Sequence, residues 1–201
     1  MKLFYAPGAC SMAVHIALNE VGLQYELEKV DLATKKTESG INYLEVNANG
    51  YVPALQLDNG ENLTEVSALL QYIADNNPDK KLLPPVGDAS RYRVLEIMNF
   101  VSAELHKNFS PLFNPASTDD IKASTLELIG KRFSYIDKHL TNRQYLTGDQ
   151  FTIADAYLTT VLGWTTFLQM DLSPWPNVAS YMGKVMSRPS VQATLKAEGL
   201  G

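Results

Sequence analysis

Residues 2–22 read KLFYAPGACSMAVHIALNEVG and predict a strand, a turn and a helix in that order. Lys2–Tyr5 is a short apolar run, Pro7–Ala9 is typical of a turn, and the apolar residues of Met12–Val21 recur at helical spacing. The only cysteine, Cys10, therefore lies at the predicted start of a helix. Unpaired N–H groups and the helix dipole favour an anion there, so the position favours a thiolate over a thiol.

A simpler interpretation of Cys10 also exists, because free cysteine is among the most buried residue types and is often only a small hydrophobe. The composition of the 201-residue chain is that of an ordinary globular protein, with 45% hydrophobic residues, 19% charged residues and a net charge of −5. Scattered lysines and arginines in an acidic chain argue against nucleic-acid binding.

One cysteine cannot form an internal disulfide, and Pro7-Gly8 stops the first apolar run before it reaches the length of a signal-peptide core. We therefore expect a cytoplasmic protein. No apolar run approaches the roughly 18 to 20 residues of a membrane span, so we expect no membrane insertion. The three histidines and the cysteine lack the close spacing of zinc or haem ligands, so no metal site is predicted.

The first 80 residues alternate between strand and helix signals and predict a thioredoxin-like α/β domain of the order βαβ-α-ββα. After the first strand and helix come a strand at Tyr25–Leu32 and a short helix near Asn42–Val46. A hairpin follows around the turn Asp58–Gly60. Thr64 then caps a helix over 65–75. The later predicted strands are Ala54–Leu57 and the segment around Leu63.

Residues 81–88 are predicted to be a linker, because prolines, glycine and charged residues cluster there, and residues 89–201 form an all-α domain. The first long helix is expected to end where Ser110-Pro111 stops it. The residues Phe151–Asp155 carry a variant of the capping box, with Thr152 and Asp155 as partners. The helices predicted in this half are Ser90–Asn108, Asp119–Leu140, one opening at Phe151, Asn177–Ser187 and Ser190–Ala197.

Three motifs resemble the bacterial beta class of the glutathione transferases. Tyr5–Ser11 is similar to the cysteine loop of that class, Val52–Leu55 to its cis-proline segment, and Phe151–Asp155 to its helix-capping motif. The resemblance extends over the whole chain and implies the two-domain glutathione transferase fold. It also implies a homodimer, glutathione as the co-substrate, and no tightly bound cofactor.

The resemblance assigns groups of the chain to each part of glutathione. A cis Val52-Pro53 bond would expose the backbone of Val52 to pair with the tripeptide, whereas a trans proline would merely start an edge strand. Glu65 and the backbone of Val66 would bind the γ-glutamyl end. Many relatives carry a serine directly after this acidic residue, but here Ser67 comes one position later. Lys35 would pair with the glycyl carboxylate, although a lysine in such a loop is usually solvated.

Cys10 and His106 are the predicted catalytic residues. An imidazole can exchange a proton with a thiol or stabilise a thiolate. Asn99, Ala103 and His106 are spaced to share one helix face, and the resemblance directs this stretch to glutathione, in part to the ligand of the partner subunit. The full set of predicted glutathione contacts is Cys10, Lys35, Val52, Pro53, Glu65, Val66, Asn99, Ala103, Glu104, Leu105 and His106, with Tyr5, Ser11, Ser67 and Lys107 as secondary candidates.

Two chemistries remain open for Cys10. Glutathione thiolate, held beside Cys10, can attack a small hydrophobic electrophile. Alternatively, the Cys10 thiolate can attack a glutathione mixed disulfide, and a cysteine without a resolving partner suits that cycle. Tyr5 is interpreted as structural and Ser11 as a helix cap or secondary donor. A glutathione-binding or protein-interaction module without catalysis is the alternative function. Phe109, Phe113, Trp164 and Phe167 are predicted to line the electrophile pocket.

Overall fold

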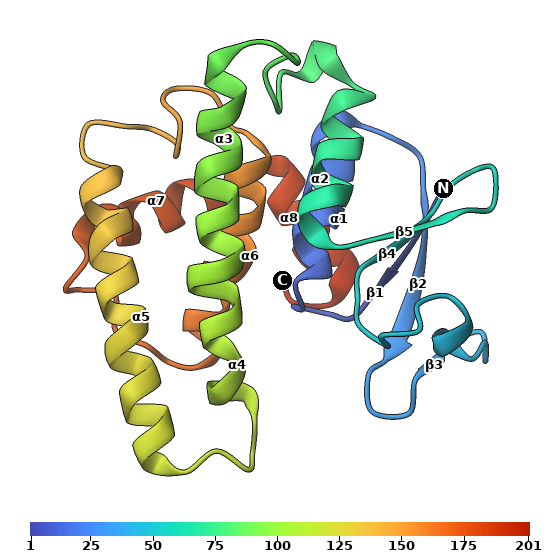
Figure 1. Cartoon of the computed structure of the whole chain (residues 1–201), viewed down its shortest axis with the longest axis horizontal. Helices are drawn as coiled ribbons and strands as arrows, with labels where there is room; N and C mark the ends of the chain where they lie inside the picture. Colours follow the sequence, from blue (N-terminus) through green and yellow to red (C-terminus); the bar gives the residue numbers. More distant parts are fainter.

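The computed structural model describes residues 1–201 and contains a mixed five-stranded sheet with eight α-helices (Figure 1). The sheet and two helices form the first part of the chain, and the remaining helices form the second. The elements are β1(Lys2–Tyr5), α1(Ser11–Val21), β2(Glu26–Asp31), β3(Lys36–Thr37), η1(Tyr43–Glu45), β4(Ala54–Gln56), β5(Asn62–Thr64), α2(Val66–Asp75), η2(Pro78–Lys80), α3(Ala89–Phe100), η3(Val101–His106), α4(Lys107–Phe113), α5(Asp119–His139), α6(Ile153–Phe167), α7(Pro176–Met186) and α8(Pro189–Glu198).

The sheet has the strand order β3-β2-β1-β4-β5. β1 pairs with β2 in parallel, with Leu3 opposite Leu27, and with β4 in antiparallel fashion, with Leu3 opposite Leu55. A parallel neighbour requires a crossover, and α1 supplies it. The sheet therefore confirms the predicted thioredoxin-like order. The two-residue strand β3 was not predicted from the sequence, and the predicted helix near Asn42–Val46 is a single 3₁₀ turn.

One large hydrophobic core joins the two parts of the chain. Helices α1 and α2 pack together, and both contact α6, while α8 also packs against α1 (Figure 1). Fully buried side chains of this core come from the sheet, such as Leu3, from α1, such as Ile16, and from the helical half, such as Met98 and Leu158. The helical half is therefore not an independent neighbour of the sheet but covers its helices.

Most predicted helix ends are confirmed within one or two residues, and two predictions are wrong. Thr64 does not cap α2, because it belongs to β5 and Glu65 occupies the N-cap position. Pro111 does not end the first long helix, since α4 continues to Phe113 with the proline inside it. None of the helices combines the length and the hydrophobicity that a bilayer span requires.

Candidate active site

A cavity of about 920 Å³ opens between the sheet domain and the helical half. It is lined from the first part by the loop before α1, the segment around Val52, and the start of α2. The second part contributes η3, α4 and α6. The predicted site residues that line it are Cys10, Val52, Pro53, Glu65, Val66, His106, Lys107, Phe109, Phe113, Trp164 and Phe167.

Cys10 occupies the N-cap position of α1, as predicted, and its Sγ donates a hydrogen bond to the Val52 carbonyl at 3.1 Å. Burial raises the pKa of the Cys10 thiol to about 11, although the backbone N–H groups of Cys10 and Ser11 and the charge of Lys107 act to lower it. The expectation of a thiolate is therefore wrong for the unliganded protein. The cost of desolvating a thiolate at this position is larger than the stabilisation that the N–H groups at the helix start give to it.

The loop before Cys10 is held on both sides by the helical half. The Gly8 N–H donates to Glu198 Oε2 at 2.8 Å, and the Gly8 carbonyl accepts from Trp164 Nε1 at 2.8 Å. Within the loop, the Ser11 hydroxyl accepts from the N–H of Ala6 and donates to its carbonyl, both at 3.2 Å. Ser11 is therefore neither a helix cap nor a cavity residue; its hydroxyl closes the loop.

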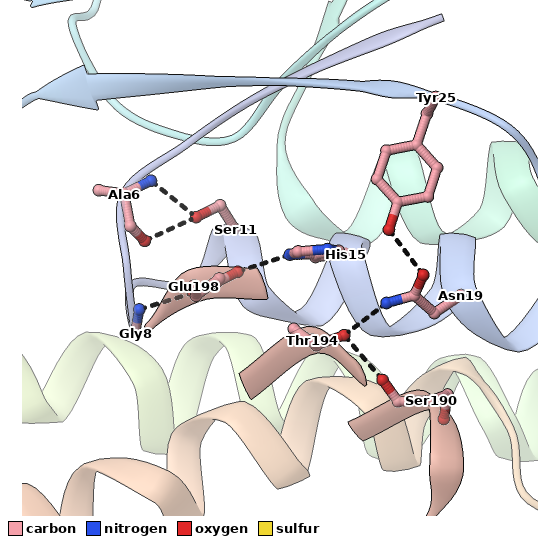
Figure 2. A network of polar contacts seen from close by, with 9 residues as sticks. All are labelled: Ala6, Gly8, Ser11, His15, Asn19, Tyr25, Ser190, Thr194 and Glu198. Carbon is pink, nitrogen blue, oxygen red and sulfur yellow. Dashed lines mark hydrogen bonds and ion pairs between the residues drawn. The ribbon is translucent and has the colours of Figure 1, made fainter. Parts of the chain in front are cut away.

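Figure 2 shows how this loop continues into a polar network between α1 and α8. His15 Nδ1 lies 2.8 Å from Glu198 Oε1, and both side chains are buried. Farther along α1, Asn19 donates to Thr194 on α8 and accepts from Tyr25. No sequence pattern predicts the contacts between α1 and α8, because His15 and Glu198, and likewise Asn19 and Thr194, lie more than 170 residues apart along the chain.

The Val52-Pro53 peptide bond is cis, as the resemblance implies. Glu65 lies across the same cavity, with a backbone φ of 70° in the left-handed region that non-glycine residues rarely adopt. No side chain caps the N–H groups at the start of α2, where Val66 also lines the cavity. Uncapped N–H groups at a helix start are suited to a carboxylate.

His106 is the last residue of the π-helical turn η3 and lies at the junction with α4. Its Nδ1 is 2.6 Å from the hydroxyl of Tyr157 on α6, and its ring meets the Trp164 ring edge-on at 5.0 Å. Burial, and then the positive charge of Lys107, lower the pKa of His106 to about 4. The imidazole is therefore neutral near pH 7.

Five residues of the predicted glutathione set do not line this cavity, and four of them belong to the stretch from Asn99 to Leu105. Asn99 and Ala103 are exposed, Glu104 pairs with Arg132, and Leu105 is fully buried in the core. For Asn99 and Ala103 the π-helical turn accounts for the difference, because its wider turn changes the angle between these residues and His106. A contact of this stretch with a partner subunit remains a prediction.

Lys35, Ser67 and Tyr5 also do not line the cavity. The Lys35 ammonium donates to the carbonyl of Gly50 at 2.9 Å, next to the cavity residue Tyr51. The Tyr5 side chain is buried in the core beside His15, which fits its structural interpretation. Ser102, Tyr157 and Thr160 also line the cavity but were not predicted from the sequence, because they lie on apolar or irregular helical stretches that carry no motif.

The comparisons with known proteins agree with this geometry. Residues 8–76 match the model of the glutathione S-transferase N-terminal domain, and residues 100–189 match that of the C-terminal domain. Glutathione S-transferase GstA of Escherichia coli O157:H7 is 46% identical over 200 residues, with 100% of both chains covered.

Two solved structures are similar over the full length of the chain. A sphingomonad glutathione S-transferase complexed with glutathione is 49% identical with a TM-score of 0.96 and 100% coverage of both chains. The beta-class glutathione S-transferase of Sphingomonas chungbukensis is 47% identical, also with a TM-score of 0.96 and 100% coverage of both chains. The resemblance seen in the cysteine loop, the cis-proline segment and the capping motif is thus confirmed, and the chain belongs to the glutathione S-transferase family.

Proposed function

We propose that the protein binds glutathione across the cavity and conjugates the glutathione thiol to small hydrophobic electrophiles. The observation that carries the proposal is that Cys10, Val52, Glu65 and His106 line one cavity although they come from four separate segments. The sphingomonad relative was solved with glutathione, which supports the same ligand here.

Each part of glutathione has a matching group in this proposal. The backbone of Val52 pairs with the extended tripeptide, and the uncapped start of α2 with Glu65 binds the γ-glutamyl end. The Lys35 ammonium lies 6.0 Å from the ring centre of the cavity residue Tyr51, and in this proposal it binds the glycyl carboxylate. The electrophile occupies the aromatic end of the cavity, where Phe113 and Trp164 pack edge-on at 5.6 Å.

The protonation state of Cys10 favours conjugation over thiol transfer. A thiol whose pKa is about 11 stays protonated at pH 7, and its S–H can turn from the Val52 carbonyl to donate a hydrogen bond to the glutathione thiolate. Thiol transfer requires the Cys10 thiolate: it attacks the glutathione sulfur of a mixed disulfide, expels the other thiolate and forms a Cys10–glutathione disulfide. A second glutathione thiolate then releases Cys10 and leaves as oxidised glutathione.

One parallel assay separates these activities. Wild type, Cys10→Ala and His106→Ala are incubated with glutathione and an aryl halide, and separately with a small glutathione mixed disulfide. We expect Cys10→Ala to retain measurable conjugation and to lose all disulfide reduction. Intact mass before and after reductant reports any glutathione adduct on Cys10. A wild-type protein that binds glutathione but is inactive in both assays would instead be a binding module.

A homodimer, in which the outward-facing Asn99, Ala103 and Glu104 approach the partner, and a cytoplasmic location are part of the same proposal. Sedimentation velocity of the purified protein tests the oligomeric state. A monomer at all concentrations would contradict the predicted partner contact.

A further inference from the structure

The hydroxyl of Tyr157 makes its one close hydrogen bond with the proposed catalytic histidine. It lies 2.6 Å from His106 Nδ1, and the hydroxyl of Ser102 is its other polar neighbour. The Tyr157 side chain is 2% exposed, and the residue lines the cavity beside His106. No motif of the sequence points to this tyrosine.

The proton in this hydrogen bond belongs to the tyrosine. If His106 carried its proton on Nδ1 and donated it, the buried Tyr157 O–H would be left with only the Ser102 hydroxyl, which makes no hydrogen bond as close as the 2.6 Å contact. A poorly paired buried donor costs free energy. Burial raises the pKa of Tyr157, so the phenol remains protonated. The phenol therefore donates and Nδ1 accepts, and a neutral imidazole that accepts at Nδ1 carries its proton on Nε2.

The ring of His106 is fixed in this orientation by its neighbours. Trp164 meets it edge-on at 5.0 Å, and Tyr157 does so at 5.8 Å. Trp164 is itself held by its hydrogen bond to the Gly8 carbonyl in the cysteine loop. The histidine, the tyrosine and the loop that carries Cys10 thus form one connected unit.

We propose that Tyr157 is a positioning residue that holds His106 as the Nε2–H tautomer, so that a neutral imidazole offers a hydrogen-bond donor to the sulfur of glutathione. The proposal rests on the proposed function, since it assumes that His106 faces glutathione. The other titratable or charged groups of the cavity near His106 are Lys107, Cys10 and Glu65. Glu104, on the same turn, is paired with Arg132.

The first test measures the tautomer in the unliganded protein. Two-bond ¹H–¹⁵N spectra of ring-labelled histidine, with His106 assigned by its loss in His106→Gln, should show a protonated Nε2 and a bare Nδ1 at pH 7. Tyr157→Phe should give a mixture of both tautomers. A proton on Nδ1 in the wild-type protein would overturn the proposal.

The second test measures catalysis with the aryl halide. Tyr157→Phe should lower kcat about tenfold while the KM for glutathione changes less than about twofold, since the ligand contacts stay in place. Because the lost hydrogen bond favoured the neutral ring, the pKa of His106 should rise towards its usual value of about 6.5, which a pH titration of the same ring ¹⁵N signals measures. Tyr145→Phe, which loses its contact with Arg188 outside the cavity, should match the wild type.

A double-mutant cycle distinguishes positioning from a general structural role. In the His106→Gln background Tyr157→Phe should have no further effect, because the two residues act as one unit. An equal loss of activity in both backgrounds would contradict the proposal. Full activity of His106→Gln would instead refute the proposed function of His106. The tautomer measured without glutathione would still show whether Tyr157 donates to His106, independently of that function.

Discussion

Cys10 is subject to two opposing electrostatic effects. Its place at the start of α1, next to the backbone N–H of Ser11 and near Lys107, favours the thiolate, whereas burial against Val52 favours the thiol. Burial dominates, and the pKa of the thiol rises to about 11. The unliganded protein therefore holds its only cysteine in an unreactive form at neutral pH.

Alkylation of Cys10 should accordingly be slow and steeply dependent on pH. Because only the thiolate reacts, the rate with iodoacetamide should rise about tenfold per pH unit from pH 7 to 10 without a plateau. Timed intact-mass measurements follow the single adduct, and Cys10→Ser, which has no thiol, is the blank. A plateau below pH 8 would show that the thiol pKa is ordinary or depressed.

Glu65 combines a site role with an unfavourable backbone conformation. Its φ of 70° suits glycine, so Glu65→Gly should stabilise the protein by about 1 kcal/mol in urea unfolding. The same change removes the carboxylate proposed for the γ-glutamyl end and should raise the KM for glutathione at least about tenfold. Glu65→Gln should raise this KM similarly without the gain in stability. A lower urea midpoint for Glu65→Gly would contradict a strained backbone.

The sequence predicted the positions of Cys10, Glu65 and His106 but not their chemical states. A residue's place in a motif can be recognised locally, because the turn and the helix signal surround it. The pKa of Cys10 and that of His106 depend on which distant segments exclude water from them. Tyr157 shows the same limit, since a tyrosine in the apolar stretch of α6 resembles any core residue.

The capping box at the start of α6 is the best example of a locally encoded element. The Asp155 carboxylate accepts from the Thr152 N–H as predicted, and the Thr152 hydroxyl donates to the same carboxylate. Asp155 also accepts from the Leu146 N–H and the Tyr181 hydroxyl, each at 2.9 Å. The last two contacts extend the cap into the preceding loop and α7. A local motif thus also fixes tertiary structure.

Asp155→Ala should therefore cost more than an ordinary helix cap. It leaves four buried donors from Leu146, Thr152 and Tyr181 without an acceptor, and we expect a loss of about 3 kcal/mol in urea unfolding. Asp171→Ala, which removes an exposed carboxylate bonded only to Ser173, is the matched control and should leave the midpoint unchanged. A loss no larger than that of the control would refute the tertiary role.

The long helix from α3 to α4 is where prediction from the sequence failed. The π-helical turn has no recognised residue signature, and Pro111 usually disfavours a helical residue before it. Here Phe109 is fully buried and its ring stacks with that of Phe113 at 6.5 Å, so packing across the proline sustains the helix. Tertiary contacts outweigh the local preference.

The whole molecule depends on contacts between its first and last segments. Glu198 on α8 accepts from the Gly8 N–H and pairs with His15, and all three groups lie inside the interface of the two halves (Figure 2). Composition and periodicity predicted two kinds of structure in one chain. These patterns could not predict the cavity, because its lining residues come together only when α6 and α8 pack against α1.

Removal of the Glu198 carboxylate should affect stability and activity together. Glu198→Ala leaves the Gly8 N–H and His15 Nδ1 without their partner, and we expect a loss of about 2–4 kcal/mol in urea unfolding. Because the cysteine loop then loses its contact with α8, the rate of glutathione conjugation should also fall. Lys196→Ala, an exposed position on the same helix, should change neither quantity. Full activity at unchanged stability in Glu198→Ala would show that the loop is held by other contacts.

The bond between Gly8 and Glu198 joins residues 190 positions apart, and this has a consequence for biosynthesis. During synthesis the anchor on α8 is translated 190 residues after the loop that it holds. In a nascent chain that has not yet reached α8, the Gly8 N–H lacks its partner, and Trp164 is the only helical-half residue that can hold the loop next to Cys10. The cysteine loop is therefore held on both sides only after α8 has been made.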